Sequence, residues 1–124
     1  MIKYDVEVTD ATQIWYLNKK QHREDGPAYI GTNGTKAWWI NGQRHRVGGP
    51  AIKYSNGSET WFRRGRKHRE DGPAATSYNG TKSWYLNGKK VTEAEVMDHK
   101  VTIDGKEVTL SAESYKALKE SIND

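Results

Sequence analysis

The chain has 124 residues, of which 34% are hydrophobic and 29% charged, and it contains no cysteine. A chain of this length forms one domain with at most a small appendage, and the lack of cysteine excludes disulfides, thiol chemistry and sulfur-ligated metals. The first residues carry no apolar run of the signal-peptide kind, and no stretch approaches the roughly 20 apolar residues that cross a bilayer. We therefore expect a soluble cytoplasmic protein without a membrane span.

The formal net charge of +4 is unevenly distributed along the chain. Residues 1–91 contain 16 Lys and Arg against 8 Asp and Glu, a balance of +8, whereas residues 92–124 contain 4 against 8, a balance of −4. The densest basic run covers residues 63–69. Such a surplus suits an acidic partner, although charge runs are as often plain solvated loops.

The first 91 residues repeat a pattern every 23 residues. This spacing relates Trp15, Trp38, Trp61 and Trp84 to one another, and likewise His22, His45 and His68. The segment HREDGPA occurs at residues 22–28 and 68–74, and the copy between them reads HRVGGPA at residues 45–51. A fixed period of this kind predicts stacked copies of one structural unit.

Each unit is predicted to contain a hairpin. The expected strand pairs are 2–9 with 12–17, 28–32 with 35–40, 51–55 with 58–63, and 74–78 with 81–86. Three of these pairs turn at Asn-Gly, which predicts type I′ turns because both central residues of such a turn need a positive φ. A second turn follows each Trp strand, and the HREDGPA segment then leads into the next unit. The expected fold class is mainly β: an antiparallel meander, or solenoid, of four two-strand repeats over residues 1–91.

Residues 92–124 break the period and are predicted to form a small α/β segment of helix, hairpin and helix. Thr92 and Glu95 make a capping-box pattern for a helix that ends at about His99. An Asp-Gly turn then indicates a hairpin over residues 101–110.

The last predicted helix covers residues 112–122 and begins after Ser111 as its N-cap. Tyr115, Leu118 and Ile122 are spaced for one apolar face. Because that face must dock, the segment serves either as a C-terminal cap of the repeat sheet or as a separate interaction arm.

The repeat motif resembles two related families. The matching segments are WYLN at residues 15–18 with HREDGPA at 22–28, and WYLNG at residues 84–88. They are similar to the MORN-type repeat, a glycine-rich β-hairpin unit of the same length, and more closely to the variant repeats of the form W-x-L-N-G…H-R-E-D-G-P-A that occur in bacteriophage-encoded proteins. The resemblance covers about residues 5–91. It implies an elongated sheet used as an interaction surface in a phage or phage-derived setting; MORN-type proteins bind partner proteins or acidic phospholipids.

Both faces of the Trp strands carry aromatic rings, so the pattern leaves open which face is buried. We interpret the four Trp and three His at the 23-residue spacing as structural. The partner surface is predicted on the other face and in the basic run, at Trp39, Phe62, Tyr85, Arg63, Arg64, Arg66 and Arg69, because Tyr, Trp and Arg dominate binding energy at protein interfaces. The alternative is core packing for the rings and solvated charge for the arginines.

Catalysis is not expected, although residues 22–25 and 68–71 each offer a base, a cation and two acids in one loop. Catalytic groups converge on one pocket, whereas two-strand units separate equivalent residues by about 10 Å. The middle copy also has Val47 and Gly48 in place of the acids. The same separation keeps the three repeated histidines from sharing a metal ion. We therefore expect no enzyme, no cofactor and no metal, and interpret the loop as turn and capping chemistry.

The expected function is binding. Given the resemblance, we predict a phage accessory protein that binds a host protein, such as a defence factor, and modulates or inhibits it. The alternative is nucleic-acid or nucleotide binding through the basic aromatic sheet, although about 10 Å between units exceeds the spacing of successive nucleotides. A third reading is a homo-oligomer that pairs through the edge strand at residues 2–9.

Overall fold

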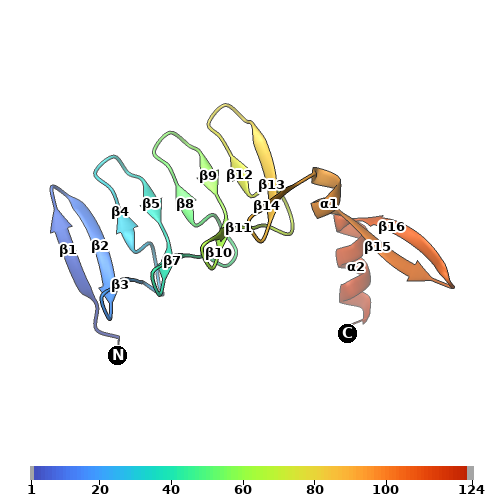
Figure 1. Ribbon diagram of the computed structural model, residues 1–124, viewed down its shortest axis with the longest axis horizontal. Helices are drawn as coiled ribbons and strands as arrows, with labels where there is room; N and C mark the ends of the chain where they lie inside the picture. Colours follow the sequence, from blue (N-terminus) through green and yellow to red (C-terminus); the bar gives the residue numbers. More distant parts are fainter. Residues whose placement is uncertain (1, 123–124) are drawn as a thin grey trace.

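Short antiparallel strands make up most of the protein, and two helices lie near its C-terminus (Figure 1). The computed structural model describes residues 2–122, except for the side chains of residues 99, 101, 112, 121 and 122. Its strands are β1 (Asp5–Thr9), β2 (Thr12–Leu17), β3 (Lys20–Gln21), β4 (Tyr29–Ile30), β5 (Lys36–Ala37), β6 (Trp39–Ile40), β7 (Gln43–Arg44), β8 (Ile52–Lys53), β9 (Glu59–Thr60), β10 (Phe62–Arg63), β11 (Arg66–Lys67), β12 (Ala75–Thr76), β13 (Lys82–Leu86), β14 (Lys89–Val91), β15 (Asp98–Ile103) and β16 (Lys106–Ser111). Its helices are α1 (Glu93–Met97) and α2 (Ala112–Ile122). The mainly β fold class predicted from the sequence is confirmed.

The main sheet is a meander, because its strands follow one another in chain order as β1-β2-β4-β5-β8-β9-β12-β13-β14. Each strand runs antiparallel to the next; between β5 and β8, for example, Ala37 lies opposite Ile52 and Lys36 opposite Lys53. Successive hairpins therefore stand side by side from β1 to β14 (Figure 1). The strand β1 forms one edge of the sheet, and all five of its residues are exposed.

A second row of hairpins runs beside the main sheet. It contains the pairs β2–β3, β6–β7, β10–β11 and β13–β14. Backbone hydrogen bonds join neighbouring members of this row: the N–H of Gly65 donates to the C=O of Arg44 and that of Gly88 to the C=O of Lys67, both at 2.8 Å. Each unit thus adds one hairpin to the sheet and one to the second row.

The two middle Trp strands are interrupted, which corrects the prediction of continuous strands over residues 35–40 and 58–63. The break in the first falls at Trp38, between β5 and β6, and the break in the second at Trp61. The N–H of Trp38 donates to Ala51 C=O at 2.7 Å, while its own C=O accepts from the N–H of His45 at 3.0 Å. The Trp backbone therefore links the two rows. Side-chain alternation did not reveal this, since it carries no information on a change of hydrogen-bonding partner.

The Asn-Gly turns of the main sheet are not type I′, which corrects a second prediction. Gly34 has a φ of +91° but Asn33 does not have a positive φ, and the N–H of Gly34 donates to Gly31 C=O at 3.0 Å. This is a type I turn followed by a left-handed glycine, as in three-residue hairpin loops. The Oδ1 of Asn33 accepts from the N–H of Thr35 at 3.0 Å and closes the loop. Both central residues have a positive φ, as type I′ requires, in the second-row turns and at Asp10-Ala11 between β1 and β2.

The core is small and lies between the two rows. Ala28, Ala51 and Ala74, the alanines that end the three His-Arg segments, are completely buried. One apolar cluster joins Ala37, Ala51, Ile52 and Phe62, with Tyr29 and Trp39 packed against it. These alanines stand where the chain re-enters the sheet, and their small side chains let the two rows approach closely. Because the buried core is small, regular backbone pairing must supply part of the stability.

The C-terminal segment follows the predicted order of helix, hairpin and helix. Thr92 and Glu95 form the expected capping box, and α1 ends at Met97, two residues earlier than predicted. The buried Val96 belongs to α1, which packs against β13, the strand that carries Trp84, and against β15. That packing supports the cap reading of α1.

The last helix packs against its own hairpin. α2 contacts β15 and β16, and its Ser111 N-cap accepts from the N–H of Ser114 at 3.2 Å. Of the predicted apolar face, Tyr115 is half-buried but Leu118 is exposed, at 37%, which corrects the expectation that the face is docked there; the side chain of Ile122 lies outside the described residues.

Candidate binding surface

The repeated histidines connect one unit to the next. The Nδ1 atoms of His22, His45 and His68 each accept a hydrogen bond at 2.9 Å, from the backbone N–H of Asn41, Arg64 and Asn87 respectively. Because Nδ1 accepts, the neutral ring carries its proton on Nε2. The Nε2 of His68 is 3.1 Å from Glu70 Oε1, a contact to which it donates. Each histidine therefore links its own unit to the turn of the next unit, 19 residues later in the sequence.

The arginine that follows each histidine stacks on the repeated Trp. The guanidinium carbons of Arg23, Arg46 and Arg69 lie 4.1, 3.9 and 3.9 Å from the ring centroids of Trp15, Trp38 and Trp61. Each Arg also donates to the C=O of the Pro four residues later, and Arg69 pairs with Asp71 at 2.9 Å. The His, Arg and acidic side chains of the His-Arg-Glu-Asp segment therefore stabilise their own loop.

Arg69 therefore has a structural position, although it was predicted as a partner contact. Its guanidinium is held between Trp61 and the backbone of Gly72, where an added Cβ would lie 2.8 Å from the guanidinium carbon. Only 24% of its side chain is exposed. Arg69 is therefore not part of the exposed basic surface.

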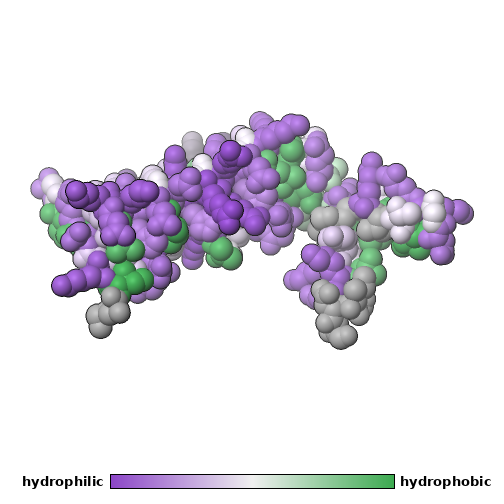
Figure 2. Space-filling model, turned by 60° about the horizontal axis from the view of Figure 1, so that its bottom comes forward, coloured by the Kyte–Doolittle hydropathy of each residue, from purple (hydrophilic) through white to green (hydrophobic). Residues whose placement is uncertain are grey.

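Two other predicted contacts, Phe62 and Trp39, pack against the core. Phe62 is 7% exposed, and Trp39 is half-buried against the same cluster. Tyr85 is half-buried as well, with the Lys67 ammonium 5.0 Å from its ring centroid. These rings do not form one flat exposed patch. Figure 2 shows mostly hydrophilic residues over the face in view, with apolar residues in small separate areas.

The remaining predicted residues form an exposed basic edge. Arg63, Arg64 and Arg66 lie at the tip of the β10–β11 hairpin, and all three are exposed. Together with Gln43 and Asn87 they line a groove of about 530 Å³. We call these three residues the arginine edge.

The arginine edge departs from the repeat at two of its positions. Arg63 stands where the other units have Leu17, Ile40 and Leu86, and Arg64 stands where they have Asn18, Asn41 and Asn87. Arg64 has a φ of +50°, a left-handed conformation that Asn tolerates better than Arg. The sequence thus places a conformationally unfavourable cation at the tip of an exposed turn.

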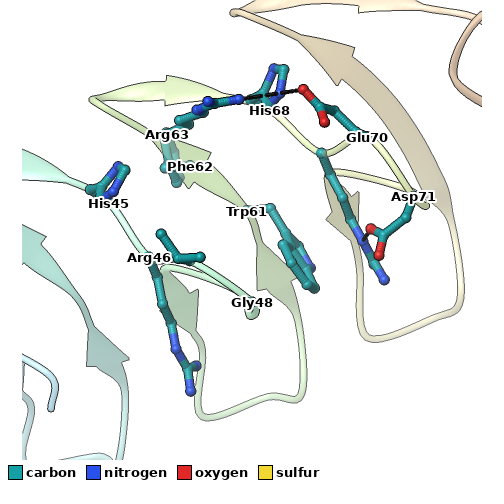
Figure 3. Close-up of a pocket in the computed structure, with 11 residues that line it drawn as sticks. His45, Arg46, Gly48, Trp61, Phe62, Arg63, His68, Glu70 and Asp71 are labelled. Atoms are coloured by element: carbon teal, nitrogen blue, oxygen red, sulfur yellow. Dashed lines mark hydrogen bonds and ion pairs between the residues drawn. The ribbon is translucent and has the colours of Figure 1, made fainter. Parts of the chain in front are cut away.

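A second group of departures lies beside the first. Val47 and Gly48 replace the Glu-Asp pair of the other His-Arg segments, and Val47 is 87% exposed. Both line a cleft of about 420 Å³ that also contains Trp61, Arg63 and Glu70 (Figure 3). In that view Arg63 reaches past His68 toward Glu70, and its Nη1 is 3.4 Å from the carboxylate oxygen. Val47 is not among the residues predicted for the partner surface, although its departure from the repeat was a signal present in the sequence.

Burial and the two neighbouring arginines affect the titration of His45. Desolvation first, and then the charges of Arg64 and Arg63, lower the pKa of His45 below 6.5. The neutral ring is therefore favoured, as its acceptor role toward the N–H of Arg64 requires. The equivalent of Glu24 and Glu70 in this unit is Val47, which cannot accept from Nε2.

The part of the chain that the structure describes contains no cluster of three or more His, Asp or Glu side chains arranged to hold a metal ion. Within the same residues no helix is both long and apolar enough to cross a membrane.

Comparison with family models, curated proteins and solved structures gives no match. The resemblance to MORN-like repeats therefore remains a prediction.

Proposed function

We propose that the protein is a non-enzymatic recognition module that binds an acidic surface of a partner protein through the arginine edge. In the phage setting that the repeat resemblance implies, the partner is a protein of the bacterial host, such as a defence factor, whose activity the bound module modulates or inhibits. A MORN-like repeat sheet then serves as a rigid support for the contact residues.

The observation that carries this proposal is that three exposed departures from the repeat lie close together. The residues that hold the repeat together keep the same type: the stacked Trp occurs in all four units, and the linking His and the loop Arg occur in the three units that have a His-Arg segment. The exposed substitutions Val47, Arg63 and Arg64 instead lie around one cleft and one groove. Replacing a turn Asn by Arg is conformationally unfavourable, so it is better explained by a contact than by stability.

The chemistry of the arginine edge suits carboxylates. Arg presents a planar fork of N–H donors that matches a carboxylate, and arginines are prominent among the residues that dominate interface energy. Within the described residues Arg63 has one acidic neighbour, Glu70, at 3.4 Å, and that carboxylate is shared with His68. The edge thus retains donors for a partner.

Nucleic acid or a nucleotide is the competing partner, because phosphates use the same donors. The two classes differ in their response to salt: phosphate contacts weaken steeply as counterions are released, whereas an interface that also buries apolar surface weakens less. The exposed Val47 beside the arginines favours the protein partner.

The test is affinity capture from a lysate of the bacterial host, with and without nuclease, at low and high salt. Wild type is compared with the variant Arg63→Glu/Arg64→Glu/Arg66→Glu and with the control Lys3→Glu/Lys36→Glu/Lys82→Glu, which makes the same charge change at three exposed lysines outside the arginine edge. One stoichiometric protein retained by wild type and control but lost by the arginine variant supports the proposal. Nuclease-sensitive, salt-labile capture would reject it in favour of nucleic acid.

A further inference from the structure

The loop of residues 45–51 keeps the hydrogen-bond donors of the other two His-Arg loops but lacks their acceptors. In those two loops the Arg Nε donates to an Asp carboxylate, at 3.2 Å from Arg23 and 2.9 Å from Arg69. The His Nε2 lies 3.4 and 3.1 Å from a Glu carboxylate oxygen. In the middle loop Val47 and Gly48 stand in place of the two acids. Its His and Arg therefore have no carboxylate partner within their own loop.

Arg46 is nonetheless held in the same position as its counterparts. Its guanidinium carbon is 3.9 Å from the ring centroid of Trp38, and its Nη1 donates to the C=O of Pro50 at 3.1 Å. A Cβ added at Gly49 would lie 2.9 Å from the same carbon. Within the described residues Arg46 forms no ion pair. Its Nε–H is thus positioned in advance for an acceptor, which lowers the entropic cost of binding one.

His45 adds a second donor to the same loop. Its Nδ1 accepts from the N–H of Arg64, so the neutral ring carries its proton on Nε2. His45 is half-buried, whereas His22 and His68 are 4% and 9% exposed. Neither its Nε2 nor the Nε of Arg46 is among the fully buried unpaired atoms of the described side chains. Both donors are therefore accessible from solvent.

Two clefts meet at this loop, and His45 and Arg46 line both of them. Their volumes are about 420 and 650 Å³. Figure 3 shows the first, with these two residues on one side and Glu70 and Asp71 on the other. Those two acids already pair with cations of their own unit. A Cβ added at Gly48 would meet nothing within 4 Å, so the place of the missing acids is open.

We propose that the loop of residues 45–51 is a receptor for two adjacent acidic side chains of the partner, which supply the carboxylates that the other loops carry themselves. A carboxylate on the Nε of Arg46 forms a charge-assisted hydrogen bond, as Asp71 does with Arg69. In the loop of residues 68–74 separate carboxylates serve the His and the Arg, so an acidic pair matches the two donors better than one phosphate group does. This inference rests on the proposed function, because it assigns the acidic partner a second anchor beside the arginine edge.

The dipeptide N-acetyl-Glu-Asp-amide tests the receptor directly, with N-acetyl-Gln-Asn-amide as its uncharged counterpart and inorganic phosphate as the competing anion. In the ¹⁵N-labelled full chain at constant ionic strength, the assigned Nε–H signal of Arg46 should move downfield and saturate with the Glu-Asp dipeptide. We expect a Kd on the order of 10 mM from two charge-assisted hydrogen bonds. Equal movement with the Gln-Asn dipeptide, movement with phosphate alone, or no movement would overturn the receptor.

Restoring the acids should close the site. The variant Val47→Glu/Gly48→Asp carries both carboxylates in the loop, and it should weaken dipeptide binding at Arg46 by about tenfold because an intramolecular acid competes. The matched control is Val47→Ala, which removes the same apolar side chain but leaves both donors free, and it should bind as wild type does. An unchanged affinity in Val47→Glu/Gly48→Asp would overturn the receptor.

The first loop offers the reverse change. The variant Glu24→Val/Asp25→Gly removes the acids that pair with His22 and Arg23. It should give the Nε–H of Arg23 a response to the Glu-Asp dipeptide that the wild-type chain lacks. A silent Arg23 signal in this variant would also overturn the receptor, because missing acids would then not create a site.

Affinity capture separates the failure of this inference from the failure of the proposed function. Val47→Glu/Gly48→Asp leaves the arginine edge intact and should reduce capture of the partner relative to Val47→Ala. Capture that is lost only in the arginine-edge variant would reject the receptor and retain the proposed function. A dipeptide response at Arg46 together with capture that does not depend on the arginine edge would retain the receptor and reject the proposed function.

Discussion

The backbone N–H of Arg64 donates a hydrogen bond to Nδ1 of His45 at 2.9 Å, across 19 residues of sequence. One side chain thereby fixes the turn that presents the arginine edge. The same link recurs from His22 and His68, so it belongs to the scaffold, and the arginine at its far end is the feature particular to this unit.

Replacing His45 by alanine should destabilise the fold modestly. The variant leaves the Arg64 N–H without its acceptor, and since that turn is exposed, water compensates part of the loss; we expect about 1 kcal/mol in the free energy of unfolding. Urea unfolding followed by Trp fluorescence measures it, with the exposed Lys53→Ala as control. A His45→Ala variant as stable as the control would show that the link contributes nothing.

Stability should fall on acidification through the pH range below 6.5. The folded protein lowers the pKa of His45 from 6.5, so the unfolded chain binds the proton more readily. Its contribution is therefore fully present above that pH and is lost as the pH falls. Unfolding curves at pH 7.5 and pH 5 should show a smaller acid loss in Arg64→Asn than in wild type, because the Arg64 charge is one cause of the lowered pKa. An equal or larger loss in Arg64→Asn would contradict this.

Arg64→Asn should stabilise the protein while weakening partner capture. Asn accommodates the φ of +50° better than Arg, and we expect a gain of about 0.5–1 kcal/mol. Arg64→Ala separates the two effects, since it removes the charge without introducing a residue suited to this conformation. Both variants should lose affinity and only the Asn variant should gain stability. Loss of stability in Arg64→Asn would disprove the strain argument.

Gly72→Ala should destabilise the loop of residues 68–74 by displacing the Arg69 side chain. The new Cβ would lie 2.8 Å from the guanidinium carbon, which Asp71 and the C=O of Pro73 hold in place. Displacing the guanidinium forfeits its stacking on Trp61, with an expected cost of about 1–2 kcal/mol. A double-mutant cycle with Arg69→Ala tests the cause: the Gly72→Ala effect should largely disappear once Arg69 is absent. Additive effects would place the cause elsewhere.

Two features of the fold could be predicted because they rest on local chemistry. The 23-residue spacing indicated the hairpins, and Thr92 with Glu95 indicated α1. The break at Trp38 could not be read this way, because it depends on which backbone group of another segment completes the hydrogen bond. The turn at Asn33 is local, but Asn-Gly suits both the type I′ turn and the three-residue loop with a left-handed Gly, so the sequence does not choose between them.

The same distinction between local and non-local information applies to the residues of the candidate site. Arg63, Arg64 and Arg66 were found from charge alone, since exposed charge is local information. The position of Arg69 between Trp61 and Gly72 depends on packing, and so does the burial of Phe62.

The most direct test of the central claim is the affinity of the purified captured protein for three versions of the chain: wild type, the arginine-edge variant and the Lys3/Lys36/Lys82 charge control. We predict that the arginine-edge variant binds at least tenfold more weakly than both others, which corresponds to about 1.4 kcal/mol, while all three unfold at similar urea concentrations. Equal weakening of the two charge variants would mean that net charge alone governs binding, and would contradict a site at the arginine edge.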